Sequence, residues 1–307
     1  RQEDVYMEPI GETILETVGN TPLVRINRLN PNPRVLMYAK LEGFNPLGSV
    51  KERIALSMIE GAEQDGTLTP ETVIVESSSG NTGIGLAMVG ALKGYKVLIT
   101  MSKRVSIERI QMLQALGAEL VLTSAEGGSD EAWDKADEIA RSDPTRYVRL
   151  NQYTNRYNPL IHYQTTGEEI WRQCDGKVDA LIVGLGTTGT IMGAGQRLRE
   201  YNPRLYIVAV EPQPKHQQQG LRNMETSRIP PILDWRLIDE RIVVTDEEAF
   251  RMTRALCREE GLFLGISAGT AMAAAAEVAK RLDGGTLVTI FPDRGEKYLT
   301  TDVFEKP

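Results

Sequence analysis

A lysine stands at the start of a predicted helix in the segment NPLGSVKERIA, residues 45–55. A turn-forming Asn-Pro-Leu-Gly sequence and Ser49, a candidate helix cap, precede it. Lys51 then lies in the first turn of the helix, where the positive end of the helix dipole disfavours its charged form. Only a neutral amine attacks an aldehyde, so this pattern indicates a lysine that forms a Schiff base. The alternative is an exposed surface lysine among other charged residues.

A second cluster of polar groups is ESSSGNTGIGLA, residues 76–87, which follows an apolar strand candidate and opens a helix. Serines 77–79, Asn81 and Thr82 bring hydroxyls, an amide and backbone N–H groups to the helix N-terminus. Such a site binds anions, and its width suits a carboxylate. The alternative is an ordinary serine-capped turn.

A third segment, GLGTTGT at residues 184–190, also joins a strand candidate to a helix. Its glycines allow the backbone to approach an oxyanion, and its threonines add hydroxyls, so it is suited to hold a phosphate. The same residues match G-x-G-x-x-G, and the next strand ends in Glu211, where a dinucleotide-binding fold keeps a ribose-binding acid. An NAD-dependent dehydrogenase is therefore an alternative on this motif.

Two further segments carry weaker signals. GISAGTAMAA, residues 265–274, is a glycine-serine turn into an alanine-rich helix, with Ser267 as the expected cap. FPDRGEKYLTTDVF, residues 291–304, is a strand end followed by a charged turn.

The elements that position these loops alternate along the chain, which predicts crossover connections and mostly parallel sheets. Many strand candidates are continuously apolar, as in a sheet covered by helices on both faces. We expect strands at residues 22–27, 35–42, 72–76, 96–101, 119–123, 147–151, 178–183, 206–211 and 286–291. We expect helices at residues 50–64, 81–94, 106–117, 129–141, 159–173, 188–201, 246–260 and 267–282. Residues 212–235, rich in prolines and amides, are expected to form a long ordered loop.

Composition excludes several classes. The 307 residues carry a formal net charge of −7 without a block of like charges, which argues against nucleic-acid binding. No apolar run approaches membrane-spanning length. Two cysteines cannot form a disulfide framework or a zinc site, and two histidines leave few histidine-based metal sites or catalytic triads. No signal peptide is visible, so a cytoplasmic protein is expected, with a removed upstream targeting segment as the alternative.

Taken together, these segments resemble the cysteine synthases among the fold-type II pyridoxal-phosphate (PLP) enzymes, from Gly19 to Phe304. The lysine, serine and phosphate segments match the family's motifs in order, and so does NQYTNRYNPLIHYQTTGEEIW at residues 151–171. The phosphate loop and the C-terminal DRGEKYLTTDVF are closer to the B isozymes. The resemblance implies an α/β fold with two domains, each a mostly parallel sheet flanked by helices. It places the smaller, mobile domain at about 45–155 and the larger at 1–44 plus 156–307.

The resemblance also implies the roles of individual residues. Lys51 would form the Schiff base with PLP and later move the α-proton, and Asn81 would hydrogen-bond the cofactor's ring hydroxyl. Ser267 would bond the pyridine nitrogen without protonating it, which makes the cofactor a weaker electron sink and suits β-elimination. The phosphate would be held by Gly186, Thr187, Thr188, Gly189 and Thr190. The substrate carboxylate would be received by Ser78, Ser79, Thr82 and Gln152.

The sequence departs from the family pattern at a few positions. Ser78 replaces the usual threonine but keeps the hydroxyl, and Ser77 and Phe291-Pro292 also differ. Arg222 stands where some O-phosphoserine-using members carry an arginine for the substrate phosphate, although acetylserine-using B forms have one too. A guanidinium suits a phosphate through its planar fork. The alternative is a surface residue of the loop.

The expected reaction is β-replacement on O-acetyl-L-serine or O-phospho-L-serine with sulfide or another sulfur donor, giving L-cysteine. Cystathionine β-synthase and serine or threonine dehydratase are alternatives within the same fold. A non-catalytic scaffold is a further alternative, which the presence of Lys51 and Asn81 argues against. The resemblance also implies a homodimer, with serine acetyltransferase or a sulfur-carrier protein as a candidate partner.

Overall fold

Two sheets, one mostly and one wholly parallel, organise the computed structural model, which describes residues 11–78 and 80–304. The larger sheet has the order β1-β2-β10-β7-β8-β9, and all its neighbours are parallel except β1 and β2. Its strands are β1 (Leu23–Arg25), β2 (Val35–Leu41), β7 (Ala180–Gly184), β8 (Tyr206–Pro212), β9 (Glu240–Val244) and β10 (Gly285–Phe291). The smaller sheet, β5-β4-β3-β6, is parallel throughout. Its strands are β3 (Val73–Ser77), β4 (Lys96–Ser102), β5 (Glu119–Thr123) and β6 (Tyr147–Arg149).

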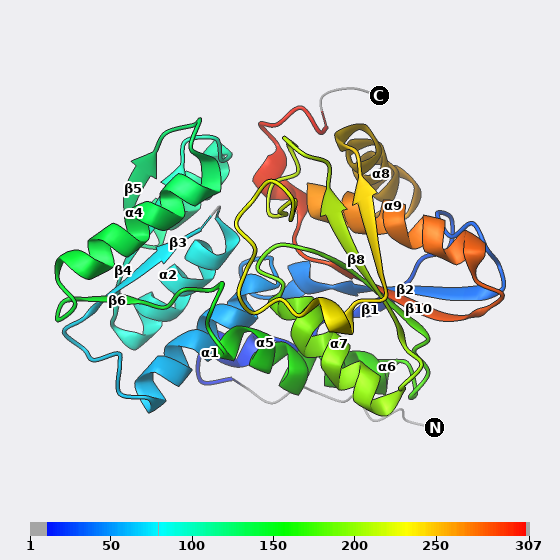
Figure 1. The fold of residues 1–307 in the computed structure, drawn as a ribbon, viewed down its shortest axis with the longest axis horizontal. Helices are drawn as coiled ribbons and strands as arrows, with labels where there is room; N and C mark the ends of the chain where they lie inside the picture. Colours follow the sequence, from blue (N-terminus) through cyan, green and yellow to red (C-terminus); the bar gives the residue numbers. More distant parts are fainter. Residues whose placement is uncertain (1–10, 79, 305–307) are drawn as a thin grey trace.

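Helices cover both faces of each sheet, as the continuously apolar strands predict. The helices are α1 (Lys51–Gln64), α2 (Asn81–Lys93), α3 (Ile107–Ala115), α4 (Gly128–Ser142), α5 (Tyr157–Ile161), α6 (Gly167–Gln173), α7 (Gly189–Tyr201), α8 (Asp246–Glu259) and α9 (Ile266–Arg281). In the larger sheet, α8 and α9 pack on one face and α6 and α7 on the other. In the smaller sheet, α1, α2, α3 and α5 share a core with one face, and α4 covers the other. Figure 1 shows the smaller sheet with α2 and α4 at the left and α8 and α9 at the right.

All nine expected strands and seven of the eight expected helices are present, with shifts of a few residues at their ends. The strand β9 was missed, because this edge strand alternates exposed and buried residues and directly follows the long loop. The expected single helix at residues 159–173 is instead α5, a π-helical turn at His162–Thr166 and α6. Residues 213–234 contain neither helix nor strand, as expected for a long loop.

All four strands of the smaller sheet fall between residues 73 and 149, inside the expected smaller domain of 45–155. The domain boundaries and the movement of that unit stay predictions. Within the described residues, no helix is both long and apolar enough to cross a membrane.

Candidate active site

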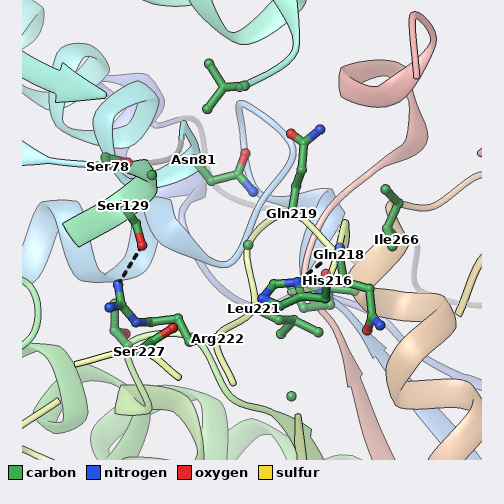
Figure 2. A pocket seen from close by; sticks show the side chains of 18 of the residues that line it. Ser78, Asn81, Ser129, His216, Gln218, Gln219, Leu221, Arg222, Ser227 and Ile266 are labelled. Atoms are coloured by element: carbon green, nitrogen blue, oxygen red, sulfur yellow. Dashed lines mark hydrogen bonds between the residues drawn. The ribbon is translucent and has the colours of Figure 1, made fainter. Parts of the chain in front are cut away.

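One cavity of about 790 Å³ lies where strands of both sheets end. The segments that follow the carboxyl ends of β3, β4, β7, β8 and β10 all contribute to its wall. Ligands of open parallel sheets bind at this position, because loops from different strands converge there. Residues from opposite sides of the cavity, such as Asn81 and Arg222, are visible in Figure 2.

Lys51 is the first residue of α1 and lies in the cavity wall. The helix cap is Val50 rather than the expected Ser49, although Ser49 Oγ accepts a hydrogen bond from the Lys51 backbone N–H at 3.1 Å. Burial lowers the pKa of Lys51 to about 8, whereas the negative charges of Asp293, Glu42 and Glu52 act in the opposite direction. The described residues offer its amine no hydrogen bond or ion pair. A larger fraction of this amine is therefore neutral near physiological pH than for an ordinary lysine.

The N-terminus of α2 brings the second motif into the same cavity. Ser78 Oγ accepts hydrogen bonds from the backbone N–H groups of Gly80 and Gly83 at 3.1 and 3.0 Å, and so orders the turn. The Thr82 hydroxyl donates to Gln152 Oε1 at 2.7 Å. The cavity wall includes Ser78, Asn81, Thr82 and Gln152, whereas Ser79 lies outside the described residues. Hydroxyls, amides and a helix N-terminus in one wall make an anion site.

The loop between β7 and α7 forms another part of the wall. Gly186, Thr187 and Thr190 line the cavity, whereas Thr188 and Gly189 are not among the lining residues. Thr188 has a φ of +72°, a region that a β-branched residue rarely adopts, and its buried Oγ1 has no partner among the described residues. Strain of this kind gathers at ligand clamps.

Two buried side chains that the sequence analysis missed support this loop. Asn158 Nδ2 donates to Thr187 Oγ1 at 3.0 Å, and a Cβ at Gly189 would overlap the Asn158 Oδ1. His162 Nε2 lies 3.3 Å from Thr190 Oγ1, and burial holds the pKa of this imidazole well below its ordinary value. Both residues lie in the segment 151–171, which the sequence analysis used only for the family resemblance. The spacing of its residues does not by itself indicate a role in phosphate binding.

Ser267 also lies in the cavity wall, although it comes much later in the chain than the lysine, serine and phosphate segments. The cap of α9 is Gly265, so the expectation that Ser267 caps the helix is wrong, and Ser267 lies one residue inside it. Its hydroxyl has no hydrogen-bond partner among the described residues. It is therefore free to bond a ligand atom.

Arg222 is buried in the cavity wall, with 5% of its surface exposed. Its Nη2 donates to Asp130 Oδ1 at 2.6 Å, and Nη1 lies 3.3 Å from the Tyr153 hydroxyl. Nη1 also lies 3.3 Å from Ser129 Oγ, a contact that Figure 2 shows. The alternative of an exposed loop residue is thus wrong, because ring and carboxylate contacts hold the guanidinium inside. The sequence around Arg222 does not reveal its contact with Asp130, which lies 92 positions away.

Asp293 is a third residue that the sequence analysis left unassigned. It follows β10, is fully buried and lines the cavity beside Pro292. Its Oδ2 accepts hydrogen bonds from Asn81 Nδ2 and the Tyr298 hydroxyl, both at 2.7 Å. In the sequence, only its position in the charged turn at residues 291–304 could have indicated that Asp293 lies in the site.

Glu211, the ribose-binding candidate of the dehydrogenase alternative, is not among the cavity-lining residues. It is buried, pairs with Arg241 and accepts a hydrogen bond from the Met224 backbone N–H at 2.7 Å. These contacts give it a structural role, so the geometry does not support dinucleotide binding.

Groups in and beside the cavity wall fit PLP in their chemistry. An amine with a lowered pKa suits its aldehyde, and threonine hydroxyls at a helix N-terminus suit its phosphate. A free serine hydroxyl and a primary amide suit its ring nitrogen and ring oxygen. The donor set that carries this fit comprises Lys51, Asn81, Thr187, Thr188, Thr190 and Ser267.

Comparison with known proteins agrees with this donor set. A family model described as pyridoxal-phosphate dependent enzyme matches residues 14–293, so the chain belongs to the PLP-dependent enzymes. A cysteine synthase of Aquifex aeolicus is 44% identical over 301 residues, covering 95% of this chain and 92% of the relative. A cysteine synthase B of Pseudomonas aeruginosa is 43% identical over 293 residues, covering 95% and 97%. Within its family the chain therefore groups with the cysteine synthases.

A solved structure supports the same grouping. The cysteine synthase of Entamoeba histolytica matches with a TM-score of 0.91 and 36% identity, covering 100% of this chain and 95% of that one. The resemblance in fold and the expected cofactor are thereby confirmed.

Proposed function

We propose that this protein is a cysteine synthase, which replaces the β-substituent of O-acetyl-L-serine or O-phospho-L-serine with sulfur to give L-cysteine. The observation that carries the proposal is the convergence of Lys51 with two polar helix N-termini in one cavity. One helix N-terminus is that of α2, and the other is that of α7. Such an arrangement provides separate places for a carboxylate and a phosphate around one reactive amine.

The cofactor would be held at four points. Residues 186–190 would bind its phosphate, Asn81 its ring oxygen, Ser267 its ring nitrogen and Lys51 its aldehyde carbon. Bound PLP supplies a conjugated ring that stabilises negative charge at the substrate Cα when the proton leaves. Because a serine hydroxyl donates no full proton to the ring nitrogen, this stabilisation stays moderate, and departure of the β-substituent relieves the charge.

The protein's own groups would perform the remaining tasks. The Lys51 amine, with its pKa of about 8, accepts the Cα proton and later returns it. The hydroxyls of Ser78, Ser79 and Thr82 and the amide of Gln152 hold the substrate carboxylate, which keeps the Cα–H bond directed at Lys51.

Arg222 would select the leaving group. Its guanidinium lines the cavity and offers paired N–H donors, which suit a phosphate better than an acetyl ester. The ion pair with Asp130 has to loosen for a phosphate to bind.

The resemblance supports further parts of the proposal. The unit at residues 45–155 would close over the substrate, the chain would form a homodimer, and the protein would act in the cytoplasm. Serine acetyltransferase or a sulfur-carrier protein would be its partner. Small-angle scattering with and without substrate tests the closure, and an unchanged profile would contradict it.

A visible absorption spectrum of the purified protein tests the function. We expect a Schiff-base band that O-acetylserine or O-phosphoserine shifts, and formation of L-cysteine after sulfide is added. The Lys51→Ala variant should lose the lysine-dependent band and cysteine formation. If neither donor shifts the band, the proposed substrates are wrong and a dehydratase becomes the better assignment. If PLP produces no band at all, the enzyme assignment itself fails.

A further inference from the structure

Asp293 lies in the cavity wall and is held by several polar side chains, but the proposed reaction gives it no role. Its carboxylate is buried, and Oδ2 accepts hydrogen bonds from Asn81 Nδ2 and from the Tyr298 hydroxyl, each at 2.7 Å. The Arg109 guanidinium lies 3.8 Å from the same oxygen. These contacts come from α2, the C-terminal turn and α3, and together they hold the carboxylate in one orientation.

The Asp293 carboxylate distinguishes the two ends of the Asn81 amide. An ionised carboxylate only accepts hydrogen bonds, whereas an amide has an accepting oxygen and a donating NH2 group. If the amide were rotated by half a turn, Oδ1 would face another acceptor with no proton between them, which is unfavourable in a buried site. The orientation of the Asn81 amide therefore depends on Asp293.

The same orientation decides what Asn81 offers to a bound molecule. Its side chain points into the pocket (Figure 2), and its Oδ1 is buried without a partner among the described residues. Nδ2 carries two hydrogens, of which Asp293 takes one. The second N–H has no acceptor among the described residues, so it can donate to a bound molecule.

We infer that Asp293 is a positioning residue that keeps the NH2 group of Asn81, rather than its Oδ1, facing the ring oxygen of bound PLP. This inference rests on the proposed placement of Asn81 beside that oxygen. An N–H donor stabilises the ionised ring oxygen, whereas a carbonyl acceptor stabilises the neutral hydroxyl. Asp293 thereby sets the ionisation of the ring oxygen without touching it.

The Asp293→Asn variant tests this inference, because an asparagine has nearly the same shape but pairs with either orientation of Asn81. The readout is the absorption spectrum of the PLP-loaded protein without substrate. The ionised and neutral ring oxygens give separate absorption bands. We expect the ratio of the ionised to the neutral band to fall by about tenfold in the variant, as for the loss of one charge-assisted hydrogen bond. The affinity of the apoprotein for PLP, from a spectral titration, should fall in parallel. An unchanged band ratio in a folded variant would overturn the inference.

Three further variants separate the possible causes. Asn81→Ala alone should lower the band ratio, and adding Asp293→Asn to it should cause no further change. Tyr298→Phe removes the other donor to Oδ2 but keeps the Asn81 contact, so it should retain the ratio. If Asp293→Asn acts equally strongly without Asn81, the carboxylate works through its charge alone and the inference is wrong. If Asn81→Ala leaves the ratio unchanged, the placement of Asn81 fails and the inference falls with it. Asp293→Ser repeats the test if the asparagine variant does not fold.

Discussion

Arg222 and Asp130 form an ion pair in the wall of the cavity, with Nη2 2.6 Å from Oδ1. Arg222 belongs to the long loop after β8, and Asp130 lies in the first turn of α4. The guanidinium also lies 5.1 Å from the centroid of the Tyr153 ring, which stacks on Trp133 with centroids 4.1 Å apart. The loop of the larger sheet is thus connected to the smaller-sheet side directly beside the cavity.

This ion pair predicts how donor preference can be changed. A phosphate has to compete with Asp130 for Arg222, so Asp130→Asn should lower KM for O-phosphoserine. Arg222→Ala should raise that KM by about 10- to 100-fold, the equivalent of a hydrogen bond to a charged group, with a smaller effect for O-acetylserine. Steady-state kinetics with both donors provides the measurement. Arg228→Ala is a matched control, because Arg228 contacts the same Trp133 but pairs with the exposed Asp134. Equal effects of Arg222→Ala on both donors would contradict the prediction.

The lowered pKa of Lys51 predicts how PLP capture depends on pH. Raising the pH through the pKa of about 8 removes the proton and produces the neutral amine that attacks the aldehyde. The rate at which the apoprotein acquires a visible band should therefore rise with pH and level off above a midpoint near pH 8. Stopped-flow mixing of apoprotein with PLP gives this rate. A midpoint near 10.5, the ordinary value for lysine, would show that burial does not act on Lys51 in solution.

A buried cluster of charges predicts a large loss of stability. Arg53 donates from Nε to Glu42 Oε2 and from Nη1 to Glu169 Oε1, each at 2.7 Å. Lys40 Nζ lies 2.7 Å from Oε2 of Glu169. Arg53→Met would leave buried carboxylates without their main partner, at a cost of about 3 to 5 kcal/mol in unfolding free energy. Urea unfolding of the apoprotein measures this cost without a contribution from cofactor binding.

The exposed pair of Arg156 and Asp65 provides the control for that experiment. Because both side chains are accessible to solvent, Arg156→Ala should cost no more than about 1 kcal/mol. A similar loss in the two variants would mean that burial adds nothing to the Arg53 cluster.

The strained backbone at Thr188 predicts opposite effects on stability and cofactor binding. Glycine tolerates a φ of +72° without steric cost, so Thr188→Gly should stabilise the apoprotein by about 1 kcal/mol. The same change removes a hydroxyl that we assign to the PLP phosphate, so affinity for PLP should fall. Thermal unfolding and a PLP titration measure the two effects. Asn151→Gly, at a φ of +54° in a residue type that tolerates this region, should change stability less. Unchanged PLP affinity in Thr188→Gly would contradict the assigned role.

Local pattern in the sequence was sufficient for most elements of the fold. Apolar runs such as β3 and β7 are buried on both faces, so their composition alone identifies them. The half-exposed edge strand β9 has a weaker signal and was missed. The π-helical turn at His162–Thr166 was missed too, because hydrophobic spacing does not reveal one additional residue in a turn.

The sequence by itself also determined which chemical groups follow which strands, and hence the family, the proposed reactive amine and the proposed anion sites. Only the tertiary structure decided which distant side chains meet. Asn81 and Asp293 are 212 positions apart, and Arg222 and Asp130 are 92 apart. Such contacts depend on how two sheets and a long loop pack together, and local periodicity carries no information about that packing. For the same reason the lysine and the phosphate loop were visible in the sequence, whereas the carboxylate that orients Asn81 was not.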